Sequence, residues 1–203
     1  MIKQYAKLGF ILAAFAAVAC VGLTFVFKAT EAPIEANKSK QLNESLRDIF
    51  RDAEEFAPEK LESPDQAVKF LEAYVAKRGG SPLGLAVKAS GSSYGGDSVL
   101  LVGIGLDGRI AGVRVLSNLD TPGLGANAAN PAYYVKKAEK VTFPGQFAGK
   151  AVGDPFEVKK DVDAITASTI TSRALTKIVK AACGAAGAWL GRAAAAPAAA
   201  GGN

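Results

Sequence analysis

An uncharged stretch of 20 residues near the N-terminus constrains the fold of this chain most. It runs from Leu8 to Phe27, and only Gly9, Gly22 and Thr24 interrupt its apolar side chains. At about 1.5 Å per residue, a helix of this length crosses the roughly 30 Å hydrocarbon core of a bilayer. The apolar part of a cleaved secretory signal is shorter, about 7 to 15 residues. We therefore predict one transmembrane helix over residues 8–27, after a short cytoplasmic N-terminus over residues 1–7, in preference to a cleaved signal.

The charges beside this stretch bear on its orientation in the membrane. Lys3, Lys7 and the N-terminal amine favour a cytoplasmic N-terminus. Lys28, Lys38 and Lys40 lie on the other side of the stretch. Charge alone therefore sets the orientation only weakly.

Composition excludes several classes of function. The chain has no histidine and two cysteines, which removes histidine-dependent triads, histidine metal sites and cysteine-rich iron–sulfur sites. Three of the 24 basic residues precede all 19 acidic ones, so the rest of the chain is close to neutral. Nucleic-acid binding needs basic residues clustered on one face of a folded domain. We expect no nucleic-acid partner.

Helical patterns dominate the segment that follows the membrane. Residues 29–39 are polar and contain Pro33, which indicates a connector, and residues 40–56 carry apolar side chains at helical spacing. Residues 63–78 begin with Ser-Pro-Asp-Gln, typical of a helix start, and have an apolar stripe of Val68, Leu71, Tyr74 and Val75 that ends at two glycines. We predict helices over both segments.

From Leu83 onward the pattern changes to short β-branched runs between glycine-rich turns. These runs predict strands over residues 85–88, 98–104 and 109–116, with Asp107-Gly108 as a hairpin turn. Further along, the pattern indicates a short helix over residues 130–140, a strand over 156–159, a long helix over 172–190 and a low-complexity tail over 193–203. The fold class is α+β, with a mainly antiparallel twisted sheet and flanking helices. The predicted layout is a connector and juxtamembrane helix over residues 28–62 and one soluble domain over residues 63–192.

Two segments could carry chemistry. Residues 120–125 read Asp-Thr-Pro-Gly-Leu-Gly, in which proline fixes one backbone angle and two glycines free others. Such a loop can approach a flat ligand closely, although a plain turn explains it as well. It lacks the lysine of a phosphate loop and the third glycine of a dinucleotide fingerprint.

The second segment, residues 163–172, reads Asp-Ala-Ile-Thr-Ala-Ser-Thr-Ile-Thr-Ser and has five hydroxyl groups just before the long helix. One or two of them are explained by helix capping, at about 1 kcal/mol each. The free N–H groups and the dipole of a helix start also make an anion site. The residues alone leave capping and phosphate binding open.

Taken together in order, these features resemble the membrane-anchored FMN-binding family. The resemblance rests on the anchor, Tyr94-Gly95-Gly96, the strand residues 101–104 and 107–110, the 121–125 loop, Gln146-Phe147 with Gly149-Lys150, and residues 162–172. It covers residues 1–190 and is strongest to the G-type subunits of Rnf electron-transport complexes. The C-type subunit of the sodium-pumping NADH:quinone reductase, usually a longer chain, carries similar motifs.

The resemblance implies a role for each motif residue. In this family FMN is joined by a phosphoester to the last threonine of a Ser/Thr-Gly-Ala-Thr motif, which corresponds to Thr169, and a flavin transferase installs it from FAD. Thr166, Ala167 and Ser168 occupy the rest of that motif. The other residues are expected to order the turn and the phosphate (Asp163, Thr166, Thr171 and Ser172) or to border the isoalloxazine ring (Thr121, Gly123, Leu124 and Gly125).

The sequence departs from the family pattern at three positions. Ala167 replaces the motif glycine, Ser168 replaces its alanine and adds a second hydroxyl, and Asp120 stands where glutamate is usual. An alanine at position 167 would be strained if the backbone angle φ there were positive. Thr169 keeps the register of the family acceptor, and we assign Asp120 no catalytic role.

The function implied by the resemblance is electron carriage with covalent FMN. The complex would pass electrons between ferredoxin and NAD and couple this to sodium or proton movement. Its partners would be the other membrane, iron–sulfur and flavin subunits, and the soluble domain would lie outside the cytoplasmic membrane. The alternatives are a component like the C-type subunit of the quinone reductase, or a flavin-free membrane-tethered binding or sensory module.

Overall fold

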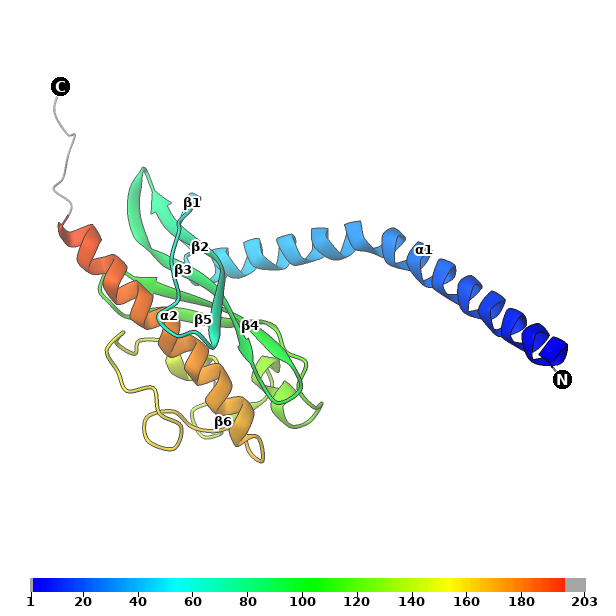
Figure 1. Cartoon of the computed structure of the whole chain (residues 1–203). Coiled ribbons are helices and arrows are strands. Elements are labelled where there is room, and N and C mark those ends of the chain that lie inside the picture. The colour runs from blue at the N-terminus through cyan, green and yellow to red at the C-terminus, as the bar shows by residue number, and fades with distance from the viewer. Residues whose placement is uncertain (1, 196–203) are drawn as a thin grey trace, which may run out of the picture. The chain divides into compact units, whose positions relative to one another are not determined.

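The computed structural model describes residues 2–195 of the 203-residue chain. The chain separates into two compact units, with the division between Asn43 and Glu44. The first unit is almost entirely helix α1 (Ile2–Ile49), whose last residues belong to the second unit. The second unit contains a five-stranded sheet and the long helix α2 (Thr169–Ala195), as Figure 1 shows.

Helix α1 is long and apolar enough to cross a membrane. Its large apolar side chains are exposed over the 8–27 stretch, with Phe15 at 73% and Phe25 at 74%. The predicted connector over residues 29–39 is wrong, because the helix continues through it with Pro33 inside. Alanine and glutamate favour helix there, and one proline removes only one backbone hydrogen bond. The helix predicted to Phe56 ends earlier, at Ile49.

The sheet is an antiparallel meander in which each strand pairs with the next along the chain. The mainly antiparallel α+β fold predicted from the sequence is confirmed. Each of the three predicted strands lies within or largely within a longer one. The strands are β1 (Glu55–Pro58), β2 (Val68–Arg78), β3 (Ser81–Ser92), β4 (Asp97–Gly105) and β5 (Ile110–Ser117).

The helix predicted over residues 63–78 is wrong, because most of this segment is strand β2. A bulge lies between Phe70 and Glu72, where Leu71 is the extra residue. The bulge moves the buried side chains from even to odd positions, so the alternation expected of a strand is hidden. Leu71, assigned to the buried helical stripe, is 48% exposed.

The signals at both ends of this segment belong to turns. Ser63 and Asp65 accept hydrogen bonds from the N–H groups of Asp65 and Ala67 and close a local turn before β2. Gly79 and Gly80 have φ of 55° and 80° and form the two-residue hairpin turn between β2 and β3. Capping residues and paired glycines serve helices and hairpins alike, which explains the error.

Two further predictions after the sheet are wrong. Instead of a helix over residues 130–140, there is a short 3-10 helix η1 (Gly125–Ala129), followed by turns and the strand pair β6 (Tyr134–Lys136) and β7 (Val141–Thr142). The short 3-10 helix η2 (Gly145–Phe147) comes next along the chain. Residues 156–159, predicted as a strand, form a loop, because the Asp161 carboxylate accepts hydrogen bonds from the N–H groups of Phe156 and Glu157. Phe156 and Lys159 have positive φ, which no regular strand allows.

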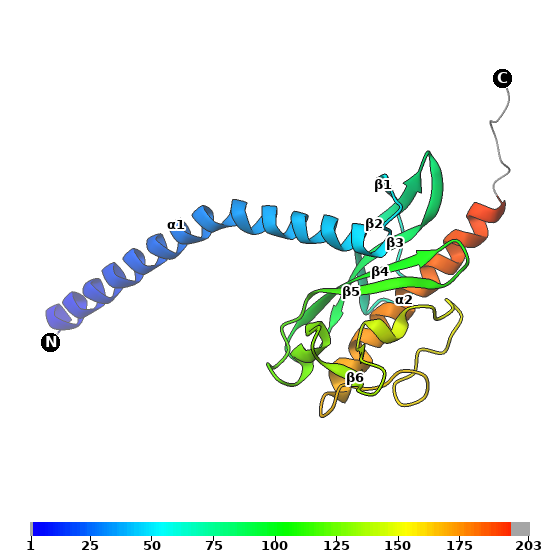
Figure 2. The ribbon, with the colours of Figure 1, turned by 180° about the vertical axis from the view of Figure 1, so that it is seen from behind.

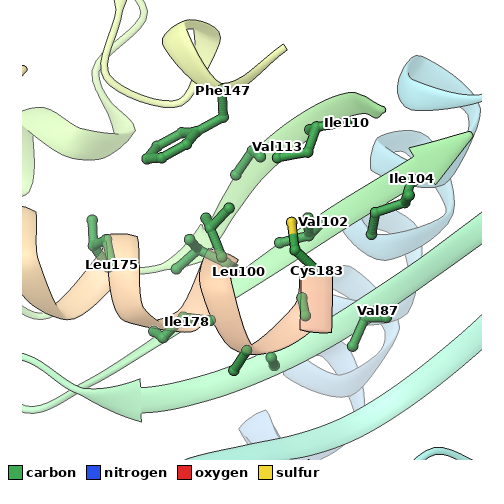
Figure 3. Packing of buried hydrophobic residues seen from close by; sticks show 14 of the residues in the cluster. Val87, Leu100, Val102, Ile104, Ile110, Val113, Phe147, Leu175, Ile178 and Cys183 are labelled. Atoms are coloured by element: carbon green, nitrogen blue, oxygen red, sulfur yellow. The ribbon is translucent and has the colours of Figure 1, made fainter. Parts of the chain in front are cut away.

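Helix α2 covers one face of the sheet and forms the core with it. It lies in front of the sheet in Figure 1 and behind it in Figure 2, and it contacts β3 and β4. Figure 3 shows Leu175, Ile178 and Cys183 of α2 facing sheet residues such as Leu100 and Val102. Burial raises the pKa of the Cys183 thiol to about 12, with a smaller contribution from Asp154, so this cysteine is a packing residue. The helix predicted over residues 172–190 is confirmed and extends to Ala195; the tail residues 196–203 lie outside the described residues.

Three glycines on neighbouring strands lie against Ile49 and Phe50, at the end of α1. A Cβ atom at Gly103 would lie 2.3 Å from Ile49, and one at Gly84 would lie 2.7 Å from the Phe50 ring. Gly112, paired with Gly103 on the next strand, is also close to Ile49. Positions 84 and 103 need glycine, because a Cβ atom there would overlap the Phe50 ring or the Ile49 side chain.

Candidate functional site

A cavity of about 440 Å³ lies where the two predicted motifs meet. Its wall combines residues of the 120–125 loop with residues at the start of α2, more than 40 positions later in the chain. The residues that line it are Tyr94, Asp120, Thr121, Leu124, Gly125, Ala167, Ser168, Thr169, Ile170 and Thr171. The cavity falls in the size range of small-molecule and cofactor sites.

A larger cavity of about 660 Å³ lies elsewhere, between β2, the segment before it and the end of α2. Its wall carries charged side chains such as Glu59, Glu62 and Arg192, and none of the motif residues. We therefore take the smaller cavity as the candidate site.

The 120–125 loop is folded by its own backbone. The carbonyl oxygen of Thr121 accepts hydrogen bonds from the N–H groups of Leu124 and Ala126, at 3.1 and 3.2 Å. Gly123 has a φ of 77°, which favours glycine. A Cβ at Gly125 would lie 2.4 Å from the Thr171 hydroxyl oxygen and 2.8 Å from Asp120 Oδ2. The second glycine is therefore needed because loop and helix touch at this point.

The turn before α2 is held by the hydroxyl group of Ser172. This oxygen accepts a hydrogen bond from the Ile165 N–H and donates one to the Ser168 carbonyl, both at 2.9 Å. The φ of Ala167 is 59°, so the alanine in place of the family glycine does occupy a strained, left-handed conformation. Thr169 is the first residue of the helix, where backbone N–H groups have no partner within the helix.

Asp120 connects three segments at the wall of the cavity. Its carboxylate accepts hydrogen bonds from the Ser93 hydroxyl at 2.7 Å and the Gly95 N–H at 2.6 Å. The Thr171 hydroxyl, close to Gly125 at the same wall, also helps to lower the pKa of this carboxyl. Burial acts to raise the pKa of Asp120, but these hydrogen bonds outweigh it and hold the pKa below its usual value. The residue is 4% exposed and carries its charge at neutral pH.

Two side chains from other segments, one of them in η2, hold the outer part of the turn. The Gln146 side chain accepts from the Asp163 N–H at 2.7 Å and donates to the Asp163 carbonyl at 3.1 Å. The Tyr133 hydroxyl accepts from the Thr166 N–H at 3.0 Å. The Asp163 carboxylate lies 3.9 Å from the Lys136 amine.

The comparisons with known proteins address the same regions. Residues 93–184 match the family model of the FMN-binding domain, and residues 1–49 match that of the RnfG N-terminal region. The G-type subunit of the proton-translocating ferredoxin:NAD(+) oxidoreductase complex of Clostridium ljungdahlii is 34% identical over 155 residues, which are 73% of this chain and 74% of that protein. The chain belongs to the RnfG family of ion-translocating oxidoreductase complexes.

Other members of the RnfG family match more of the chain. The G-type subunit of the Na(+)-translocating ferredoxin:NAD(+) oxidoreductase complex of Acetobacterium woodii is 31% identical over 86% of this chain and 87% of its own length. The corresponding subunit of the ion-translocating oxidoreductase complex of Vibrio cholerae is 32% identical over 89% of each. The crystal structure of NqrC from Shewanella oneidensis, with 18% identity and a TM-score of 0.50 over 72% of this chain and 73% of that one, has a similar fold.

Seven of the eleven site residues predicted from the sequence of this RnfG family member line the cavity. They are Thr121, Leu124, Gly125, Ala167, Ser168, Thr169 and Thr171. Gly123, Asp163, Thr166 and Ser172 lie outside the lining, and Ser172 and Asp163 take part in the hydrogen bonds that shape the turn. The roles assigned to these residues remain predictions.

Several residues that support the site had no role assigned from the sequence. Tyr94 and Ile170 line the cavity, although they had no predicted role. Ser93, Tyr133 and Gln146 hold the site from other segments. The Tyr-Gly-Gly run at residues 94–96 was the one available signal for the first segment, because it forms part of the family resemblance. Gln146 also forms part of the resemblance, whereas Tyr133 belongs to none of its motifs and was expected first as a surface or core aromatic.

Proposed function

We propose that this chain is the FMN-carrying electron-transfer subunit of a membrane-bound, ion-translocating ferredoxin:NAD oxidoreductase complex. The observation that carries the proposal is the shared cavity, where the 120–125 loop meets the start of α2 at Thr169. The names of the relatives support the assignment to such a complex, and the FMN-binding domain match supports the cofactor.

The residues at the cavity fit FMN. Tyr94, Leu124 and Ile170 expose 68%, 42% and 62% of their surface, and they offer apolar area beside a flat ring system. The hydroxyl groups and free N–H groups at the start of α2 suit a phosphate, whose charge the helix dipole stabilises by about 0.3 to 1 kcal/mol. Bound FMN would supply reversible electron transfer, and the protein would supply its position and electrostatic surroundings.

We propose Thr169 as the covalent attachment point. A flavin transferase would bring FAD, the Thr169 oxygen would bond to the phosphorus next to the flavin, AMP would leave, and the hydroxyl proton would be lost to a base. Thr169 is half-buried at the helix start, whereas the neighbouring Ser168 is only 7% exposed. The difference in exposure favours Thr169 over the second hydroxyl as the group that a transferase can reach.

The partners in this proposal are the other membrane, iron–sulfur and flavin subunits of the complex. Iron–sulfur chemistry is assigned to them because this chain has two cysteines and no histidine. Helix α1 would hold the flavin domain next to those subunits, on the extracytoplasmic side of the membrane. Adding protease to intact spheroplasts should then degrade the domain without lysis; protection until lysis would place it in the cytoplasm.

Flavin attachment is tested by in-gel fluorescence after denaturing electrophoresis. The wild-type chain, produced with its transferase, should fluoresce under ultraviolet light and gain the mass of FMN minus water. Thr169→Val should lose at least nine-tenths of the fluorescence, whereas the matched control Ser168→Ala should keep it. A fluorescent Thr169→Val band would move the attachment elsewhere. An unmodified wild-type chain in the presence of active transferase would overturn the proposal and favour a flavin-free tethered module.

A further inference from the structure

We propose that Asp120 sets the reduction potential of the flavin as a fixed negative charge at the cavity wall. The proposal rests on the proposed function, because it takes FMN to occupy this cavity. Asp120 is the one charged residue among those described as lining the cavity. It therefore supplies the side-chain charge at the wall that bound FMN would meet.

Neutral hydrogen-bond donors, and not a cation, stabilise the negative charge of Asp120. Its hydrogen-bond donors are the Ser93 hydroxyl and the Gly95 backbone N–H, and the nearby Thr171 hydroxyl also stabilises the charged form. Within residues 2–195, the ion pairs that lysine and arginine side chains form are with other carboxylates. Neutral donors stabilise the carboxylate but leave a net charge of minus one at this position.

The position of the carboxylate is fixed by packing. Asp120 Oδ2 lies against Gly125, where even a Cβ atom would approach it to 2.8 Å, and the residue is 4% exposed. Water screens a charge much less in such a place than at the surface. The side chain cannot become fully hydrated without breaking the hydrogen bonds from Ser93 and Gly95.

A fixed anion makes reduction of the flavin harder. Each added electron, delivered by a reduced iron–sulfur partner or by a chemical titrant, brings one negative charge into the cavity unless a proton from water follows it. Repulsion from the Asp120 carboxylate raises the free energy of that added charge. The midpoint potential should therefore lie lower than it would with a neutral residue at position 120.

The test compares midpoint potentials by anaerobic dithionite titration of full-length, flavin-loaded protein in detergent. Asp120→Asn removes the charge but keeps the shape, and the Ser93 and Thr171 hydroxyls can accept from the new amide. We expect a more positive potential in Asp120→Asn. Ser93→Ala, which removes one hydrogen bond and keeps the charge, should shift the potential much less. Equal potentials in loaded wild type and Asp120→Asn would overturn the proposal, as would an equal shift in Ser93→Ala.

A second pair of variants covers the case in which Asp120→Asn carries no flavin. Asp120→Glu and Asp120→Gln have side chains of equal length and differ in charge. The Gln protein should have the more positive potential, and equal values would contradict the role of charge. Absorbance and in-gel fluorescence measure flavin loading separately. A wild-type chain without flavin would contradict the proposed function, whereas a loaded chain with an insensitive potential would contradict only this inference.

Discussion

At the scale of single residues, Ala167 is the least favourable choice in the candidate site. Its φ of 59° lies in the left-handed region, which costs an alanine about 1 kcal/mol more than a glycine. The strain persists because the Ser172 hydroxyl holds the flanking residues Ile165 and Ser168 in place. The departure from the family motif is therefore tolerated by the fold at an energetic cost.

Ala167→Gly should raise the free energy of unfolding. We expect a gain of about 0.5 to 1 kcal/mol, because relief of the backbone strain exceeds the added entropy of the unfolded chain. Urea denaturation of the full-length protein in detergent, followed by tryptophan fluorescence, measures the difference. A decrease in stability would mean that the turn is not strained in solution.

Asp120 also links stability to pH. Its pKa is below the usual 3.8 when the chain is folded, so its stabilising effect is present above that value and is lost as the pH falls through the folded-state pKa. Asp120→Asn should lack this part of the acid sensitivity. Below pH 4 its free energy of unfolding should fall less steeply than that of wild type, by at most about 1.4 kcal/mol per pH unit. Parallel pH profiles would contradict this role.

At the scale of elements, strand β2 shows what sequence patterns could and could not provide. The antiparallel strands β4 and β5 were predictable because their apolar residues are continuous and a hairpin signal separates them. The bulge at Leu71 was not predictable, because it depends on how β2 pairs with β3. A single extra residue turned a strand pattern into a helical one.

Leu71 and Val75 distinguish the strand from the predicted helix. Both would face the core in a helix, but in β2 Leu71 is 48% exposed and Val75 is 7% exposed. Leu71→Ser should change the free energy of unfolding by no more than about 0.5 kcal/mol, whereas Val75→Ala should lower it by about 1 to 3 kcal/mol. Chemical denaturation measures both. Comparable large losses in the two variants would favour the helical pattern.

In the candidate site, too, some features follow from neighbouring residues in the sequence, and others depend on contacts between distant segments. Both motifs could be read from residues that are contiguous in the sequence, and Thr169 as the acceptor stays a prediction that rests on the family resemblance. The contact between Gly125 and Thr171 and the supports from Tyr133 and Gln146 could not, because each joins segments far apart in the chain. Hydrogen bonds of this kind leave no periodic pattern.

At the scale of the whole molecule, membrane attachment depends on the apolar stretch of α1. Phe15 and Val18 are exposed at 73% and 72%. A single Asp at the centre of a membrane helix costs about 2.5 to 3.5 kcal/mol on insertion scales. Phe15→Asp combined with Val18→Asp should therefore release most of the chain from the membrane pellet in alkaline carbonate. Tyr5→Asp, which lies before the stretch, is the control and should stay in the pellet; retention of the double variant would contradict anchoring by this stretch.

The turn around Thr169 is held by contacts from segments far apart in the chain. Tyr133, Gln146 and Asp120 each contribute from a different part of the chain, and α2 continues from the turn into the core. A copy in which α2 has not docked does not present this shape. A modifying enzyme that recognises this shape would therefore attach the cofactor to correctly folded chains and leave misfolded chains without it.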